Sequence, residues 1–217
     1  MKITSVEPQR NNPRRFNIFL DGQFAFGADE DLVVDKRLIK GKEILKEDLP
    51  GLLEESEIGK LMERMYGLFG RRQRSEKEVL DYLRQLSFKR RLKDQGEVTE
   101  MMTAALVDKL KRKGLVNDLE FAKAWVESRS KKKGINALKV ELFSKGINRE
   151  VIDEVLSVNY QVSSQTQTAE KLLGRKMRTW KNLPDAKFKQ KALRFLMSRG
   201  FEYELSKEIV ENVLKEV

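Results

Sequence analysis

The sequence predicts a mainly α-helical protein in which three tandem three-helix units stack into an elongated, curved array behind a small N-terminal β-hairpin and helix segment. Three observations predict this fold class. Apolar residues recur at helical spacing over most of the 217 residues. A pattern of residues around Gly146 returns around Gly200, and Asp21-Gly22 separates two β-prone runs near the N-terminus.

The N-terminal segment, residues 1–55, reads differently from the rest of the chain. In "RRFNIFLDGQFAFG" the Asp21-Gly22 dipeptide tolerates the positive φ angles of a type I′ hairpin turn. The run "KITSV" at the start supplies a possible third strand. We therefore predict a small antiparallel sheet, after which helical patterns begin on either side of Gly41.

The first helical unit is expected over residues 56–116. Ser75 and Glu78 have the spacing of a capping box, which starts a helix by pairing its first backbone N–H groups. Thr99 is a second N-cap candidate, and the helix after it ends with basic residues before Gly114.

The second and third helical units are expected over residues 117–162 and 163–217. Asp118 is the predicted N-cap of the first helix of the second helical unit, and Gly134 is predicted to end that helix. Between the units, "VNYQVSSQTQTAE" is rich in Ser, Gln and Thr, so we expect a flexible joint there.

The internal repeat can be followed position by position. A leucine, Leu142 or Leu196, stands four residues before the glycine, and an apolar residue, Ile147 or Phe201, follows it. A third copy is expected around Ser87, between Leu83 and Phe88, with a longer connection to the next helix. Because so small a unit cannot bury its apolar face alone, adjacent units are expected to share a continuous core.

The formal charge of +10 is unevenly distributed. Residues 1–60 hold 10 Lys/Arg against 12 Asp/Glu, whereas residues 61–217 carry a net charge of +12. A basic surface favours nucleic acid or an acidic protein face as partner.

Composition excludes most catalytic chemistry. The chain has no cysteine and no histidine, which removes the usual nucleophiles, general bases and zinc ligands. The glycines fit no phosphate-binding motif, and the acidic runs fit no calcium loop. We expect no enzyme activity, no catalytic residue, no cofactor and no metal. Without an apolar run long enough for a membrane span or a secretory signal, we expect a cytoplasmic protein.

Basic residues gather at helix boundaries, where they serve either to solvate helix ends or to bind a partner. Because the clusters recur, we predict a binding role for three of them, on exposed side chains. The predicted partner-binding residues are Arg71, Arg72, Arg74, Lys111, Arg112, Lys113, Arg129, Lys131, Lys132 and Lys133. A further cluster contains Lys89, Arg90, Arg91 and Lys93.

Aromatic residues lie on apolar helical faces, so we predict core packing for them rather than stacking on bases. They are Tyr82, Phe121, Trp125, Phe143, Trp180, Phe195 and Phe201.

Three motifs in order carry a family resemblance: "RQRSEKEVLDYL" around Ser75, "LVNDLEFAKAWVESR" at 115–129 and "GINALKVELFSKGI" at 134–147. Together they resemble the bacterial RecX family of recombination regulators, over residues 56–217, and the N-terminal hairpin resembles the extra segment of some members. The third unit, with Trp180 and "RGFEYEL", follows the pattern only loosely.

The resemblance implies a non-catalytic protein that binds the RecA recombinase. It would lie along the groove of the recombinase filament on single-stranded DNA and inhibit ATPase activity, strand exchange and filament growth during DNA repair and recombination. We expect a monomer with no membrane partner. The alternative from charge alone is a helical module that binds single- or double-stranded DNA and competes for it directly. A nuclease that uses carboxylates and a metal is the third alternative.

Overall fold

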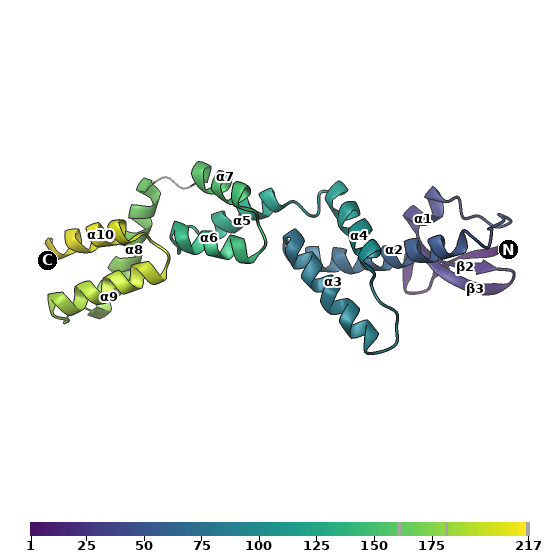
Figure 1. Ribbon diagram of the computed structural model, residues 1–217, viewed down its shortest axis with the longest axis horizontal. Coiled ribbons are helices and arrows are strands. Elements are labelled where there is room, and N and C mark those ends of the chain that lie inside the picture. The colour runs from purple at the N-terminus through teal and green to yellow at the C-terminus, as the bar shows by residue number, and fades with distance from the viewer. Residues whose placement is uncertain (160–161, 181, 216–217) are drawn as a thin grey trace. The chain divides into compact units, whose positions relative to one another are not determined.

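The structure is a computed structural model that describes residues 1–159, 162–180 and 182–215 (Figure 1). The chain divides into two compact units. Unit 1 contains residues 1–73 and 82–116, and unit 2 contains residues 74–81 and 117–217.

The fold begins with strands β1 (Ile3–Gln9), β2 (Asn12–Leu20) and β3 (Gln23–Asp29) and the short helix α1 (Glu30–Asp35). The helices that follow are α2 (Leu49–Phe69), α3 (Glu76–Arg91), α4 (Glu100–Arg112), α5 (Asp118–Arg129), α6 (Ile135–Ser144), α7 (Arg149–Asn159), α8 (Val162–Trp180), α9 (Asp185–Ser198) and α10 (Tyr203–Lys215). The mainly helical fold and the N-terminal sheet are confirmed.

The three strands form an antiparallel sheet in the order β1-β2-β3. Asp21 and Gly22 have φ angles of 48° and 86°, as the predicted type I′ turn requires. Ile18 and Phe26 are buried and contribute to one core with Leu32 of α1. The hairpin therefore has an apolar face that α1 helps to cover.

The sheet packs closely against α2. Arg15 on β2 is buried and donates from Nη2 to the Gly27 carbonyl at 3.1 Å, and Ser56 on α2 donates to the same oxygen. A Cβ at Gly59 would overlap the Asp29 carboxylate. The glycine at position 59 therefore allows the helix to approach the end of the sheet.

Helix α2 also forms part of the first helical repeat. Its buried residues include Leu61 and Met65, and it packs against α4, which buries Leu106 and Leu110. Since α2 is continuous through residue 56, a domain boundary there would divide a helix. We propose that the first repeat begins at Leu49 instead.

The connection between α3 and α4 differs from the expected third copy of the repeat. Helix α3 continues past Ser87 to Arg91, and Phe88 is 53 % exposed. The Ser87 hydroxyl bonds to both the N–H and the carbonyl of Val98, which is buried. Thr99 caps α4 as predicted. Val98, and not Phe88, thus takes the position that Ile147 occupies in the second repeat.

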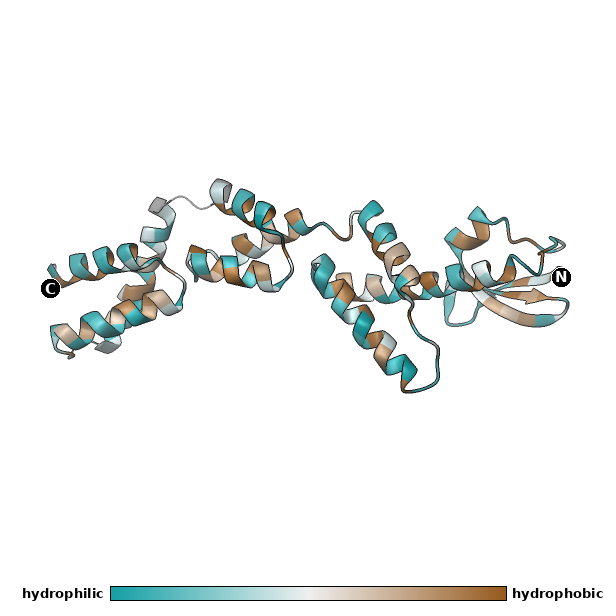
Figure 2. Ribbon diagram, viewed as in Figure 1, coloured by the Kyte–Doolittle hydropathy of each residue, from teal (hydrophilic) through white to brown (hydrophobic). Residues whose placement is uncertain are grey.

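Unit 2 contains two three-helix groups with separate cores. Helices α5, α6 and α7 surround Leu138 and Leu142. Helices α8, α9 and α10 surround Leu173 and Leu196. Hydrophobic residues lie mainly on the inner faces of the helices in each group (Figure 2). The tandem helical repeats are confirmed, but the expectation of a continuous core is wrong for these two groups, because each buries its own set of apolar residues.

A glycine turn joins the second repeat to the start of α3. Gly146, with φ of 80°, follows α6, and the Ser75 hydroxyl donates to the Lys145 carbonyl at 2.7 Å. A Cβ at Gly146 would overlap the side chain of Lys77. Lys145 also pairs with Glu78 at 2.6 Å. Here glycine is needed both for its φ angle and for its size.

The same arrangement joins the third repeat to the start of α6. The N–H of Gly134 donates to the Arg199 carbonyl at 2.9 Å, and the N–H of Asn136 donates to the Gly200 carbonyl at 3.0 Å. Gly200 has φ of 86°, and a Cβ at Gly134 would overlap its carbonyl. We call these two contacts the repeat junctions.

Two predicted helix signals in the second repeat are wrong. Asn117, not Asp118, caps α5 by accepting from the N–H groups of Leu119 and Glu120. Gly134 does not end α5 but is the N-cap of α6, with φ of −80°. Asp118 instead accepts the N–H of Glu76 at 2.8 Å. In both cases a contact with another repeat decides the role of the residue.

The predicted flexible joint between the second and third repeats coincides largely with helix. Val158 and Asn159 end α7, and residues 162–170 form the first turns of α8. The remaining two positions, 160 and 161, lie outside the described residues.

The aromatic residues divide into three groups. Phe121 and Phe201 are buried as predicted. The partly buried ones are Tyr82, Trp125, Trp180 and Phe195. Phe143 is 73 % exposed, so its prediction as a core residue is wrong. On α6 it lies away from the face of Leu138 and Leu142, beside the equally exposed Val140.

Replacing Leu142 by alanine is expected to lower the free energy of unfolding by about 2–5 kcal/mol, because its side chain is fully buried. Val140→Ala on the exposed face of the same helix is the matched control, with an expected change below about 0.5 kcal/mol. Urea denaturation followed by circular dichroism measures both. Equal losses for the two variants would contradict the assignment of the core face.

Candidate functional site

A network of charges around Trp125 lies on the surface of the second repeat. The indole Nε1 of Trp125 donates to Glu141 at 2.9 Å, and Arg129 stacks over the ring with its guanidinium carbon 4.1 Å from the centroid. Arg129 and Lys133 both pair with Glu141. Lys145 lies 5.2 Å from the ring centroid. The Glu141 carboxylate thus binds the indole N–H and two cations, and one of these cations, Arg129, also stacks on the indole ring.

The ionisation of Glu141 reflects these neighbours. Burial raises the pKa of its carboxyl group. Hydrogen bonds from Lys133 and Trp125, together with the positive charges of Lys133 and Arg129, lower this pKa by more than burial raises it. The net effect is a pKa below the ordinary value of 4.5. Glu141 is therefore ionised at neutral pH and partly neutralises the predicted cluster.

The predicted cluster before α3 is not uniformly exposed. Arg71 and Arg72 are exposed, and Arg72 donates to the Gln73 carbonyl at 2.9 Å. Arg74 is half-buried, and its Nε has no hydrogen-bond acceptor within the part of the chain that the structure describes. The expectation that Arg74 is exposed is wrong, because Arg74 directly precedes the buried N-cap Ser75.

The predicted cluster at the end of α4 is exposed but partly paired. Arg112 forms an ion pair with Asp108 at 2.9 Å, and Lys113 lies 3.5 Å from Asp31 on α1. The oxygens of Tyr66 and Asp31 raise the pKa of Lys113. Since exposed ion pairs are weak, these cations remain able to exchange partners.

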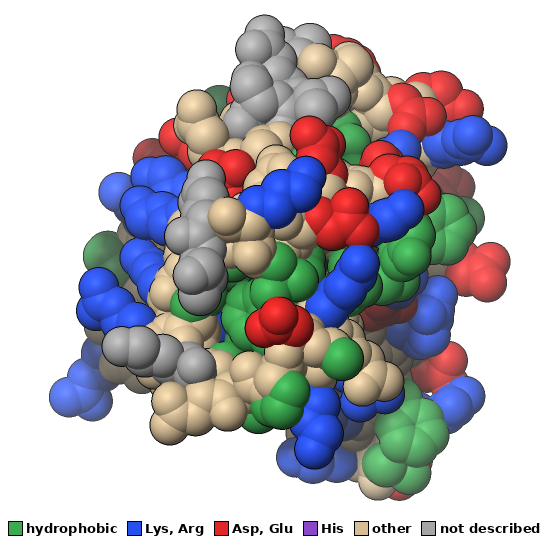
Figure 3. All heavy atoms as spheres, turned by 90° about the vertical axis from the view of Figure 1, so that its left-hand side faces the viewer, with side chains coloured by type: hydrophobic (Ala, Val, Ile, Leu, Met, Phe, Trp, Pro, Cys, Tyr) green, Lys and Arg blue, Asp and Glu red, His purple; other side chains and the backbone are tan. Residues whose placement is uncertain are grey.

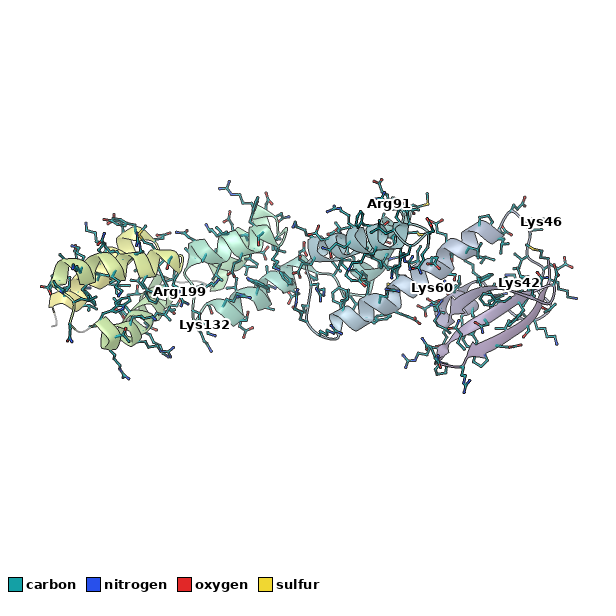
Figure 4. All side chains as sticks on the ribbon, turned by 90° about the horizontal axis from the view of Figure 1, so that it is seen from below. Lys42, Lys46, Lys60, Arg91, Lys132 and Arg199 are labelled. Atoms are coloured by element: carbon teal, nitrogen blue, oxygen red, sulfur yellow. The ribbon has the colours of Figure 1, made fainter. Side chains whose placement is uncertain are left out.

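The predicted cluster before α6 divides in two. Arg129 and Lys133 face Glu141, whereas Lys131 and Lys132 are exposed and have no ion-pair partner among the residues that are described. Figure 4 labels the position of Lys132 in the second repeat. The structure thus brings two of the four predicted residues into the Trp125 network and leaves two directed to solvent.

Two rows of cations on the third repeat were missed in the sequence. Lys171, Arg175 and Arg178 are exposed on α8, and Lys187, Lys191 and Arg194 are exposed on α9. Figure 3 shows Lys and Arg side chains around a hydrophobic region on the face that this repeat presents. The spacing of four and then three residues, which places a row on one helix face, is the signal that would have found them.

Metal binding and membrane crossing each require a particular arrangement of residues. In that part of the chain no group of three or more acidic side chains is placed to hold a metal ion. None of the described helices combines the length and apolar character that crossing a bilayer requires.

Models of the RecX family match three parts of the chain. The N-terminal domain of regulatory protein RecX matches residues 1–45, the second three-helix domain matches residues 117–156 and the third matches residues 163–210.

Curated relatives match nearly the whole chain. The regulatory protein RecX of Bacillus pumilus is 34 % identical over 216 residues, which cover 99 % of this chain and 76 % of the relative. The regulatory protein RecX of Listeria monocytogenes (strain EGD-e) is 30 % identical, and the match covers 100 % of this chain and 77 % of that protein.

Solved structures agree. A crystal structure of regulatory protein RecX matches with a TM-score of 0.78 and 25 % identity over 97 % of this chain and 98 % of that one. RecX from Lactobacillus salivarius matches in fold, with a TM-score of 0.62 and 22 % identity over 74 % of this chain and 97 % of that one.

The fold and its surfaces define a protein of tandem three-helix repeats with cations exposed on the repeats and a small sheet at the N-terminus. With the matches over its length, the chain belongs to the RecX family of regulatory proteins.

The Glu141 network makes a testable prediction about pH. Because folding lowers the pKa of Glu141, its contribution to stability is present above the ordinary value of 4.5 and is lost as the pH falls through the folded-state pKa. The stability difference between the native protein and Glu141→Gln should therefore shrink between about pH 7 and about pH 3. Urea denaturation across this range measures it.

The control is Glu127→Gln, which changes an exposed carboxylate on α5. A difference for Glu141→Gln that stays constant with pH, or that grows in acid, would contradict the network.

Proposed function

We propose that this protein binds a RecA-type recombinase, chiefly as the filament on single-stranded DNA, and inhibits its ATPase activity, strand exchange and growth. Membership of a family of regulatory proteins, matched from the N-terminal domain to the third repeat, is the observation that carries the proposal. We further propose that the protein acts in the cytoplasm as a monomer and without catalysis of its own.

Binding alone is sufficient for such regulation. A protein that contacts adjacent subunits in the groove of a filament holds them in one arrangement, and so couples its own binding to their ATP turnover. Neither a cofactor nor a metal is needed for this. In the cluster before α6, Lys131 and Lys132 are the residues that we expect to contact the partner, because they are exposed and Glu141 pairs with Arg129 and Lys133 instead.

A second candidate function is competition for DNA. The two rows of exposed cations on α8 and α9 favour it, since regularly spaced Lys and Arg residues neutralise backbone phosphates. In this alternative the protein coats single-stranded DNA, and also binds duplex DNA, without contacting the recombinase. Its affinity would fall with salt at a log-log slope of about −0.7 per phosphate neutralised.

Titrating the protein into recombinase assembled on single-stranded DNA tests the proposal, with ATP hydrolysis as the readout. We expect inhibition at protein concentrations well below those that saturate the same DNA without recombinase. Inhibition that appears only as the bare DNA becomes saturated would favour competition. Unchanged ATPase activity at stoichiometric excess would exclude both mechanisms.

Reversing the charge at Lys131 and Lys132 together should weaken binding to the filament by about tenfold, because exposed ion pairs are worth up to about 1 kcal/mol each and about 1.4 kcal/mol is a factor of ten in affinity. Stability should change by less than about 0.5 kcal/mol, since both side chains are exposed. Fluorescence anisotropy of the labelled filament measures the affinity.

The matched control is Lys40→Glu with Lys46→Glu, which makes the same change in net charge on exposed residues of the N-terminal segment. Equal weakening by both pairs would show that general charge attraction, and not a contact at Lys131 and Lys132, sets the affinity.

A further inference from the structure

The first repeat carries an insertion that the other repeats lack. Leu83 precedes the N-cap Thr99 by 16 positions, whereas Leu142 precedes the N-cap Asn148 by six. In the third repeat, Leu196 also precedes residue 202, before α10, by six positions. The additional residues extend α3 by more than a turn and return to α4 through residues 92–98. We call residues 88–97 the α3 extension.

The α3 extension is an ordered part of unit 1. At its base, Ser87 binds the N–H and the carbonyl of Val98. Arg90 is largely buried and pairs with Glu57 of α2 at 3.3 Å, and its carbonyl accepts the N–H of Gln95 at 3.1 Å. Asp94 and Gly96 supply the positive φ angles that reverse the chain. The extension is therefore held in position, although the core does not require it.

The outer side of the extension presents an apolar pair to solvent. Phe88 and Leu92 are 53 % and 70 % exposed, and their spacing of four residues places them on one face. Cations border this face: Arg91 lies 5.7 Å from the Phe88 ring centroid, and Arg84 and Lys89 are exposed at neighbouring positions. Figure 4 labels Arg91 at the end of α3. Phe88 and Leu92 thus form an exposed apolar pair with a cationic border, on a segment that the other repeats lack.

We infer that the α3 extension docks Phe88 and Leu92 into an apolar cleft of a protein partner whose rim carries carboxylates. The bordering cations set the charge of that rim. A nucleic-acid strand fits less well, because an aliphatic side chain such as Leu92 offers no aromatic face to a base, and Arg91 already lies by the Phe88 ring. The inference rests on the proposed function, so the partner is a recombinase subunit of the filament.

The test makes Phe88→Ala and Leu92→Ala together and compares this double variant with the unaltered chain of 217 residues. Binding to recombinase assembled on a fluorescein-labelled oligothymidylate is measured by anisotropy, and binding to the same oligonucleotide without recombinase is measured in parallel. We expect the double variant to bind the filament about tenfold or more weakly, because buried anchors dominate interface affinity. Binding to the bare oligonucleotide should change by less than about twofold, since only the cations contact phosphates.

The matched control replaces Val140 and Phe143 by alanine, since this exposed apolar pair on α6 has similar exposure. It should leave filament binding within about twofold, because the expected loss belongs to specific anchors. If the first double variant lacks a cooperative thermal transition, Leu92→Asp, at a more exposed position, replaces it.

Three outcomes would overturn the inference. If the Phe88 and Leu92 variant binds the filament as tightly as the native protein does, the docking contact is excluded, but the proposed function is not. Parallel losses on the filament and on the bare oligonucleotide would assign the extension to DNA. A native protein that does not bind the filament at all would exclude both the proposed function and this inference.

Discussion

In each repeat junction of unit 2, a left-handed glycine turn brings its carbonyl groups against the first turn of a helix in the preceding repeat. At Ser75 the acceptor is the Lys145 carbonyl, and at Gly134 and Asn136 the acceptors are those of Arg199 and Gly200. The first N–H groups of a helix lack intrahelical partners, so the later repeat supplies to α6 the cap that its own N-terminal glycine cannot. A substitution in the turn therefore acts on two repeats, and folding becomes cooperative between neighbours.

The fold could be predicted wherever a signal is local. Asp21-Gly22 sets its own backbone angles, and Thr99 caps a helix that begins immediately after it, so both were assigned correctly. Gly134 was misread because its role depends on a carbonyl 65 positions away, at Arg199. Phe88 was misread because the longer connection was expected after it, whereas the contact between Ser87 and Val98 shows that Phe88 already belongs to the inserted residues.

The candidate surfaces were less predictable than the fold, because a sequence shows how many charges a segment has but not which of them are paired. Arg129 and Lys133 look equivalent to Lys131 and Lys132 along the chain, yet Glu141 on the next helix engages only the first two. Lys113 likewise pairs with Asp31 on α1, which precedes α2 in the sequence and is far from Lys113 along the chain. The helical spacing of the cations on α8 and α9 indicates that each row lies on one helix face. These cations were missed because other residues separate them in the sequence, so they do not form an obvious cluster.

The placement of Trp125 has an optical consequence. The chain contains two tryptophans, and the other, Trp180, lies beside Phe188 and Phe195 in the third repeat. The Trp125 indole touches a carboxylate and a guanidinium at the border of solvent, and such charges shift the emission of an indole. With Trp180 replaced by phenylalanine, the protein would carry a single tryptophan, which lies beside Arg129. Its emission would report the moment at which an incoming anion takes this cation from Glu141.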